Sequence, residues 1–491
     1  MVASFVSALK PSMFGLAFVH MWIYCSTHRF LESGGVSVPQ VLYSAMSVAL
    51  VGLALLLWRR RETLRSADRP LGARTLLILD TLAAIAMALG GVALSVELPM
   101  PAGLRTAVGA AVGGVGVMWA YGRWVQVYAR LDLRFSAPLI FLTMVLGSSC
   151  KTVIDFLPPV AAAVVFACLP FAAFACARRA TTQLPAAPEP DRYYNRRTIG
   201  SLGRVVCGVA AFSFTMGIIQ AAFLSRTLEP YVASVLVNHG TEILIALVFF
   251  WWVGVLGRGL DFGRTWRLIL ILMITALVFE SFLVGTAAHA MLLALLRTAH
   301  ALLVVYFLFL AISDVARHSS YEPLAVYAVG WLAYTLPFAV GNMAGSAMAQ
   351  SAFAPFITSV AVWALVVSAL ILLDDRSLGN QLIFAELNEG GIEDADALAK
   401  RAGAAQRAIE EAPSTPRTDA LRARCQVLAR KHGLTSREGE VLELLVRGHS
   451  KTRIAETFLI SENTVRGHAK HIYAKLGVHS KQELLDVFEK R

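Results

Sequence analysis

A cluster of basic and small residues near the C-terminus has the composition of a surface that binds nucleic acid. If the residues around 463–476 form a helix, its apolar side chains fall on one face at three- and four-residue spacing: Val465, Ala469, Ile472 and Leu476. The opposite face then carries Asn463, Gly467, Lys470 and Ala474, flanked by Arg466 and His471. Small side chains let a helix enter the major groove, and basic ones donate hydrogen bonds to phosphates and base edges. The pattern indicates a DNA-reading helix.

The residues before this helix should position it. Gly448 and residues 459–461 interrupt the apolar periodicity of the stretch 434–485 and divide it into short helices. Between these breaks, the apolar residues that should pack beneath the DNA-reading helix are Ile454, Ala455 and Phe458. This is the pattern of a helix-turn-helix. The stretch also holds four histidines, but no cysteine or carboxylate completes a ligand set at a usual spacing, so we predict no metal site.

The same stretch resembles the LuxR-type helix-turn-helix found at the end of NarL/FixJ response regulators. The matching positions are Leu434, Thr435, Arg437, Glu438, Val441, Leu442, Leu445, Gly448, Ser450, Ile454, Ala455, Ile460, Ser461, Thr464, Val465, His468, Ile472, Lys475, Leu476, Gly477, Val478 and Ser480. The sequence departs from the family after Ser450, where Lys451, Thr452 and Arg453 replace the frequent Asn-Lys-Glu, and at Lys481. These departures affect phosphate contacts rather than the fold.

The resemblance implies specific contacts with operator DNA. Lys451 and Thr464 are expected to contact phosphates, Arg466, Gly467 and Lys470 to approach base edges, and His471 to lie beside them. LuxR-type domains usually bind inverted half-sites as dimers, and the expected contact is a final helix over 480–489 with exposed Leu484, Val487 and Phe488. RNA polymerase is a candidate partner. A helical protein-interaction module on the same scaffold is the alternative interpretation.

The rest of the chain has the composition of a membrane protein. Of its 491 residues 57% are hydrophobic and only 16% charged, and the mean hydropathy is +0.61. Such a chain is too apolar for a soluble enzyme of this length. Twelve apolar segments are long enough to cross a bilayer. They lie near residues 11–28, 36–58, 74–96, 103–122, 137–155, 157–177, 202–224, 231–256, 267–285, 289–312, 323–349 and 353–373.

The basic residues orient these spans. Successive loops lie on alternate sides of the membrane. Most of the Lys and Arg residues behind the net charge of +11 fall in loops of one side, whereas the other side holds only Arg29, Arg105, Lys151 and Arg226. The positive-inside rule then puts both termini in the cytoplasm. Since the LuxR-type resemblance implies a bacterial protein, we expect the chain in the inner membrane of the cell. The first span lacks the basic start and small-residue exit of a cleavable signal, so we expect it to be retained.

Twelve spans divided six and six by a cytoplasmic loop over 178–201 resemble the major facilitator superfamily, whose two halves enclose a cavity. Corresponding loops of the halves, 68–74 and 257–264, resemble that family's Gly-, Asp- and Arg-rich loop. The small-residue pairs Gly109/Gly113 and Gly341/Gly345 require only close helix packing.

Polar residues inside the spans need a partner or a water-filled cavity, because a charge costs several kcal/mol in lipid. Glu242 and Arg297 could form a structural ion pair or could line a site for a small polar or anionic ligand. The ligand-sensing candidates are His20, Trp22, Gln220, Asn238, Glu242, Arg297 and His300. Asp80, in a span expected at the periphery, has a structural role in this interpretation.

No nucleotide-binding loop, nucleophile elbow, zinc spacing or kinase signature occurs in the chain, so we expect neither an enzyme nor a cofactor. No receiver domain precedes the helix-turn-helix, so the membrane part must supply the signal. An acidic helical linker over 374–432 joins the two parts, which are a transmembrane sensor over 1–373 and a DNA-binding domain over 433–491. Within the linker, a helix is expected to end at Gly433.

The sequence therefore predicts an all-α protein that is a membrane-embedded one-component transcriptional regulator. A transporter-like twelve-helix domain senses a small molecule, and a four-helix LuxR-type domain binds operator DNA. The alternative is a transporter of the major facilitator type with an autoregulatory or vestigial DNA-binding tail. Proteolytic release of the tail within the linker is a third interpretation.

Overall fold

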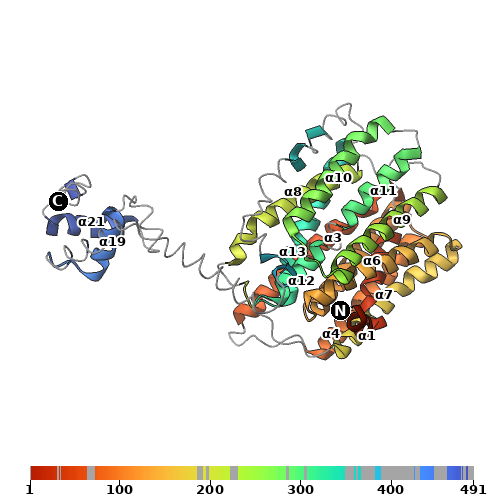
Figure 1. Ribbon diagram of the computed structural model, residues 1–491, viewed down its shortest axis with the longest axis horizontal. Coiled ribbons are helices and arrows are strands. Elements are labelled where there is room, and N and C mark those ends of the chain that lie inside the picture. The colour runs from red at the N-terminus through yellow and green to blue at the C-terminus, as the bar shows by residue number, and fades with distance from the viewer. Residues whose placement is uncertain are drawn as a thin grey trace. The chain divides into compact units, whose positions relative to one another are not determined.

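The computed structural model describes most of the membrane part and the helical core of the C-terminal part. The described residues are 2–29, 32–33, 35–63, 72–184, 192–194, 198–221, 231–283, 287–302, 307–348, 359–360, 363–366, 382–388, 425, 429, 432–446, 462–476, 478 and 483–484. The chain divides into two compact units, Met1–Asp396 and Ala397–Arg491 (Figure 1). The first unit thus includes residues that the sequence assigns to the linker.

The first unit is almost entirely helical, as predicted. Its first elements are α1 (Val2–Ala8), η1 (Pro11–Phe14), α2 (Leu16–Tyr24), η2 (Cys25–Arg29), α3 (Val38–Thr63), α4 (Ala73–Ser95), α5 (Ala102–Tyr128), α6 (Leu133–Asp155) and α7 (Pro159–Gln183). After the central loop follow η3 (Thr198–Leu202), α8 (Gly203–Ile219), α9 (Tyr231–Phe250), η5 (Trp251–Val255), α10 (Phe262–Leu283), α11 (Ala287–Ala301), α12 (Phe309–Arg317), α13 (Pro323–Met348) and α16 (Ala385–Asn388). Two short antiparallel strands, β1 (Glu32–Ser33) and β2 (Val36–Ser37), pair Ser33 with Val36.

Eight described helices are long and apolar enough to cross a membrane. They correspond to eight of the twelve predicted spans. Of the other four, the first coincides with α2 and its flanking turns, the ninth with α10, and the tenth with α11 and α12. The twelfth, 353–373, falls mostly outside the described residues. The count of twelve stays a prediction.

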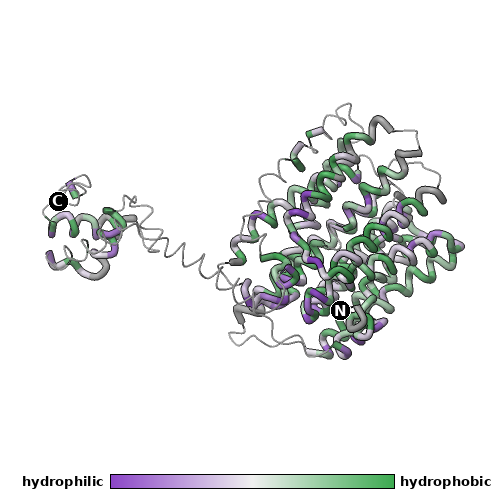
Figure 2. Tube along the Cα trace, in the orientation of Figure 1, coloured by the Kyte–Doolittle hydropathy of each residue, from purple (hydrophilic) through white to green (hydrophobic). Residues whose placement is uncertain are grey.

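Most residues of these helices are apolar along their length, as the colours of Figure 2 show. Large hydrophobic side chains are left exposed, among them Val48 at 74%, Val160 at 77% and Leu244 at 62%. In water such a surface would be unfavourable, because each exposed apolar Å² forgoes about 25 cal/mol of burial energy. The surface is compatible with contact to lipid.

Glycines let the helices approach closely. A Cβ at Gly345 would lie 2.7 Å from the Ile218 carbonyl oxygen, and one at Gly341 would press on the carbonyl oxygen of Phe214, so α13 packs backbone to backbone on α8. A Cβ at Gly113 would press on the indole of Trp22. The expectation that these small-residue pairs serve helix packing is confirmed.

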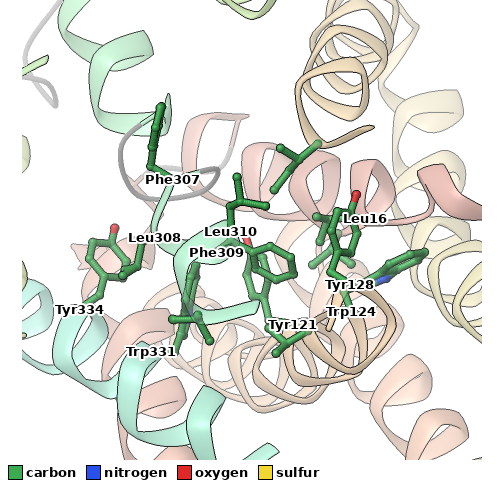
Figure 3. Packing of buried hydrophobic residues seen from close by; sticks show 14 of the residues in the cluster. Leu16, Tyr121, Trp124, Tyr128, Phe307, Leu308, Phe309, Leu310, Trp331 and Tyr334 are labelled. Atoms are coloured by element: carbon green, nitrogen blue, oxygen red, sulfur yellow. The ribbon is translucent and has the colours of Figure 1, made fainter. Parts of the chain in front are cut away.

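Aromatic side chains join helices from the two predicted halves (Figure 3). Tyr121 of α5 packs on Trp331 of α13 with ring centroids 4.8 Å apart, and Tyr128 of α5 meets Phe309 of α12 edge to face at 5.5 Å. All four side chains are buried. Such pairs contribute about 0.5–1.5 kcal/mol each beyond their buried area, so this cluster is a substantial part of the contact between halves.

The C-terminal unit has its own small core. Helix α19 (Ser436–Val446) packs Val441, Leu442 and Leu445 against α21 (Glu462–Leu476). The predicted inner stripe of α21 is confirmed, since Val465 and Ile472 are fully buried and Ala469 is 1% exposed. The residues expected to pack beneath it, at 454, 455 and 458, lie outside the described residues.

Two further expectations concern the ends of this unit. Gly433 has φ +63°, and the Leu434 amide donates to the Ala429 carbonyl at 2.9 Å, the arrangement of a glycine-terminated helix, as predicted. Leu484 was expected to be exposed at a dimer contact, but its side chain is fully buried in the core of the unit. That expectation was wrong, because the core needs an apolar residue from the final segment to cover α21. The other two residues expected at the contact lie outside the described residues.

The glycine packing can be tested with two substitutions of the same kind. Gly341→Ala should destabilise the detergent-solubilised protein by about 1–3 kcal/mol, because the added methyl group meets backbone that cannot move aside. Gly240→Ala on α9 is the matched control, since a Cβ there has no neighbour within 4 Å. Thermal unfolding by scanning fluorimetry should show a lower midpoint for the first variant alone. Equal midpoints would contradict the packing argument.

Candidate nucleic-acid interface and intramembrane polar cluster

The face of α21 opposite its buried stripe does not take part in the core of the C-terminal unit. Thr464, His471 and Ala474 are exposed, and Gly467 is half-buried. Arg466 and Lys470 lie on α21 at the predicted positions, but their side chains are outside the described residues, as is Lys451 entirely. The helix therefore offers a surface with the predicted order of small and polar positions.

A capping box fixes the start of α19 beneath α21. The Thr435 hydroxyl accepts the Glu438 amide at 3.2 Å, and the Glu438 carboxylate accepts the Thr435 amide at 2.8 Å. This reciprocal pair satisfies two amides that a helix start leaves without partners. The T-x-x-E spacing could have indicated this capping box, but the sequence analysis named both residues only as positions that match the LuxR-type family.

The same carboxylate ties α19 to the end of α21. Lys475 donates from Nζ to Glu438 Oε2 at 2.7 Å and to the Gly433 carbonyl at 3.1 Å, and the Lys475 carbonyl contacts His432 Nδ1 at 3.0 Å. His471, a predicted DNA contact, lies 3.7 Å from Glu438 Oε1 with its side chain 68% exposed. Glu438 thus sets the angle at which α21 leaves the core.

These contacts stabilise the charged form of Glu438. The hydrogen bond from Lys475, followed by that from the Thr435 amide, lowers the pKa of Glu438 to about 2. Because the folded pKa lies below the ordinary value, the carboxylate stabilises the domain fully above pH about 4.3. That contribution is lost as the pH falls through the interval between the two values.

In the membrane unit, Glu242 of α9 has a partner that the prediction did not name. Lys151 of α6 donates from Nζ to Glu242 Oε2 at 3.1 Å, and the Ser148 hydroxyl donates to the same oxygen at 2.5 Å. All three residues are buried. Lys151 was counted among the loop charges although it falls inside the predicted span 137–155. The count was wrong, because Lys151 lies within α6 and its buried ammonium group needs an anion. Arg297, the proposed partner, lies half-buried on α11, within electrostatic range of Glu242.

A second carboxylate extends this cluster. Asp155, one turn beyond Lys151, accepts a hydrogen bond from the Tyr24 hydroxyl at 2.6 Å and lies 3.2 Å from His239 Nε2. The other His239 nitrogen, Nδ1, is 3.7 Å from Glu242. His239 therefore stands between two carboxylates, and the cluster joins α2, α6 and α9. The i, i+4 spacing of Lys151 and Asp155 could have indicated their common helix face.

The remaining sensing candidates divide into packed and half-buried residues. Trp22 is fully buried and donates to the Met87 carbonyl at 3.1 Å, so it serves packing. His20 Nδ1 lies 3.3 Å from the Tyr121 hydroxyl. Asn238 is buried on α9 one turn before Glu242. Gln220 is half-buried at the end of α8.

His300 is half-buried on α11 and faces α13. Its Nε2 lies 3.3 Å from the Tyr334 hydroxyl, and its ring stacks on Phe338 at 5.8 Å. The contacts of this sensing candidate are therefore with α13 and, with ring centroids 6.4 Å apart, with Phe212 of α8.

A separate buried ion pair holds α4 to α5. Asp80 Oδ1 accepts from Arg123 Nε and from Trp119 Nε1, both at 2.9 Å. Arg123 was counted as a loop charge, but α5 extends beyond the predicted span to residue 128 and buries it. Arg123 is therefore the ion partner of Asp80, and this buried pair supports the structural role predicted for Asp80.

Comparison with known proteins concerns the C-terminal unit. Residues 432–488 match the family model of bacterial regulatory proteins, luxR family. These residues are a luxR-family DNA-binding domain. The match does not extend to the membrane helices.

Two relatives of the luxR-family domain match it over the same length, and one of them is a regulatory protein by name. It is 47% identical over 53 residues to the Fimbriae Z protein of Escherichia coli strain K12, covering 11% of this chain and 25% of that protein. It is 43% identical over 53 residues to the oxygen regulatory protein NreC of Staphylococcus aureus strain JH9, covering 11% of this chain and 24% of that protein. The chain thus spans about a quarter of the length of these relatives.

The role of Glu438 can be tested on the fragment 418–491. Glu438→Ala removes the cap and the ion pair, and should lower the free energy of unfolding at pH 7 by about 2 kcal/mol. Glu438→Gln keeps an acceptor for the Thr435 amide and should lose about half as much. Urea unfolding followed by circular dichroism measures both.

Glu440→Gln, an exposed position on α19, is the control and should stay within about 0.5 kcal/mol of the parent. The difference between parent and Glu438→Gln should shrink as the pH is lowered from 5 towards 2, because over this range the carboxylate takes up a proton in the unfolded chain before it does so in the folded domain. A difference that does not change with pH would contradict the assigned charge interaction.

Proposed function

We propose that the chain is a membrane-embedded one-component transcriptional regulator, which senses a small molecule through its membrane domain and binds operator DNA through its luxR-family domain. The observation that carries the proposal is that this domain shares one chain with the eight membrane-length helices found among the described residues. In such a chain no separate protein is needed to pass a signal from membrane to DNA. The membrane domain takes the place that a receiver domain has in NarL/FixJ regulators.

Contacts between chain segments support a membrane domain with both termini in the cytoplasm. Segments that the topology assigns to the cytoplasmic side meet one another: Ser12 donates to Gln183 at 2.7 Å, and the Tyr194 amide donates to the His318 carbonyl at 3.1 Å. Tyr24 and Asp155, from the ends of two spans assigned to the opposite side, also meet. This agreement supports the twelve-span arrangement of the major facilitator type and a place in the inner membrane.

The intramembrane cluster is the best candidate for the sensing site. Tyr24, Lys151, Asp155, His239 and Glu242 come from three helices, and α9 belongs to the predicted second half while α2 and α6 belong to the first. A polar or anionic ligand could compete for Lys151 and so change how the halves meet, since a ligand shifts an equilibrium only through contacts that differ between states. Two residues predicted from the sequence, Asn238 and Arg297, flank this cluster.

DNA binding can be tested through Lys470. In cells, chromatin immunoprecipitation of the tagged full chain should enrich a limited set of sites with two-fold symmetry, as expected of a homodimer on DNA. Lys470→Ala should weaken binding of the fragment 418–491 to such a site by about 1–3 kcal/mol, and Lys470→Arg, which keeps the charge, by less. Unchanged binding by Lys470→Ala would contradict the assigned base contact.

Sensing can be tested by breaking the intramembrane ion pair. Glu242→Gln and Lys151→Gln each leave a buried charge without its partner, which should lower the membrane level of the protein or hold transcription at one extreme. The double variant removes both charges, and should reach wild-type membrane levels but lose the transcriptional response to a panel of polar metabolites. A normal response in the double variant would make the pair structural only.

Uptake of the active metabolite into proteoliposomes distinguishes the alternative function. Accumulation by the wild-type chain would favour a transporter with a regulatory tail. Response without accumulation is the result expected here.

A further inference from the structure

The segment 382–388, which the sequence assigns to the linker, is packed into the membrane domain. Leu382, Ile383 and Phe384 are 1%, 2% and 0% exposed, and Ala385 is 6% exposed. We call these seven residues the docked segment. The only covalent connection from the membrane domain to the luxR-family domain runs through it, so its attachment bears on how that domain is held.

Phe384 is the apolar anchor of the docked segment. Its ring lies 5.9 Å from that of Phe262 on α10 and 6.3 Å from that of Phe307 just before α12. Its backbone has φ +64°, the one positive value among the described non-glycine residues. A bulky residue in this conformation is unfavourable, so the surrounding contacts hold the segment against a local preference for another backbone conformation.

Asp314, at the end of α12, is the polar anchor. Its side chain is fully buried, and its Oδ2 accepts a hydrogen bond from the Phe384 amide at 3.1 Å. The Tyr193 and Tyr194 hydroxyls donate to its two oxygens at 3.3 and 3.2 Å, and His318 Nδ1 lies 2.8 Å from Oδ1. The central loop, the end of α12 and the docked segment therefore share one carboxylate.

A second carboxylate completes the attachment. Glu386 Oε2 lies 3.1 Å from His318 Nε2 and 3.5 Å from Arg317 Nε. Burial lowers the pKa of His318, but its contacts with Asp314 and Glu386 outweigh burial and raise the pKa to about 9. The imidazole is therefore a cation at neutral pH, bound by a carboxylate at each nitrogen.

These groups could also be considered as metal ligands, since single atoms of Asp314, His318 and Glu386 lie within 4.8 Å of one another. A metal would need a histidine nitrogen without a proton. Both nitrogens of His318 face carboxylates, and the Glu386 oxygen that faces it also faces Arg317. The nitrogens of His318 and the facing oxygens of Asp314 and Glu386 are thus already engaged with one another.

The docked segment touches both predicted halves. The segment packs against α6 of the first half, where Glu386 comes within electrostatic range of Asp132. Asn388 lies against the loop after the eighth predicted span, where a Cβ on Gly259 would be 3.1 Å from the Asn388 Cα. Phe384 and Glu386 contact α10 and α12 of the second half. A change in how the halves meet must therefore break some of these contacts.

We propose that the docked segment is an autoinhibitory latch, which restrains the luxR-family domain until the halves of the membrane domain rearrange and release it. The inference rests on the proposed function. Seven extended residues span up to about 25 Å, so release lengthens the tether by that order. Two tails must meet on one operator, and their effective concentration depends on whether the tether can span the distance. Release of the latch should therefore raise occupancy of DNA.

The test measures release and DNA occupancy on the same full-length chains. Ala385→Cys places a small thiol in the buried part of the segment, and its labelling by maleimide-polyethylene glycol in inside-out vesicles reports release. Asn388→Cys is the exposed reference, three residues further on. Phe384→Ala removes the apolar anchor, and Glu386→Gln removes one charge with almost no change of shape. Arg264→Gln, whose side chain is 77% exposed, is the control variant.

Phe384→Ala and Glu386→Gln should each raise labelling of the thiol introduced by Ala385→Cys relative to the thiol introduced by Asn388→Cys. They should also raise occupancy at sites enriched by chromatin immunoprecipitation, on the order of threefold. Arg264→Gln should change neither. The variants are compared at equal protein levels in the membrane. If Phe384→Ala folds poorly, Glu386→Gln alone provides the test.

Three outcomes would overturn the latch. Labelling that does not rise in either variant would mean that these contacts do not hold the segment. Increased labelling with unchanged or reduced occupancy would mean that release does not free the DNA-binding domain, and would leave the proposed function intact. Absence of enriched sites for every chain, wild type included, would refute the proposed function and this inference with it.

Discussion

A charge buried among apolar helices must meet a countercharge, and the first unit is arranged around this requirement. Lys151 and Glu242 satisfy it across α6 and α9, and Asp80 and Arg123 satisfy it across α4 and α5. Removing one partner of such a pair is unfavourable by about 3–5 kcal/mol, whereas the pair as a whole adds little net stability. The pairs therefore specify which helices are neighbours more than they strengthen the fold.

Between the charges, the helices are held by shape. Gly341 and Gly345 bring α13 against the backbone of α8, and Tyr121, Tyr128, Phe309 and Trp331 fill the space between α5 and the second half. Lipid provides no hydrophobic drive between helices, so close packing and hydrogen bonds have to supply the association. A rearrangement of the halves would exchange one such set of contacts for another.

The luxR-family domain uses a carboxylate for the same purpose in a smaller core. Glu438 caps α19 and binds Lys475 at the far end of α21, so one side chain positions the DNA-reading helix on its support. Asp314 does the equivalent for the docked segment, where the central loop, α12 and Phe384 share it. In both places a buried or nearly buried anion joins segments that are distant in sequence, because each of its oxygens can accept more than one hydrogen bond.

The sequence by itself determined the features that depend on near neighbours. The inner stripe of α21, the glycine end of the helix before α19 and eight membrane-length helices follow from periodicity, backbone freedom and local hydropathy, and all were predicted. Tertiary structure alone decided which distant residues meet: Lys151 rather than Arg297 as the ion partner of Glu242, 91 residues away in the chain, Leu484 inside the core, and residues 382–388 docked in the membrane domain. These depend on the relative placement of whole helices, which results from many weak packing contacts together and is not encoded in the spacing of any one segment.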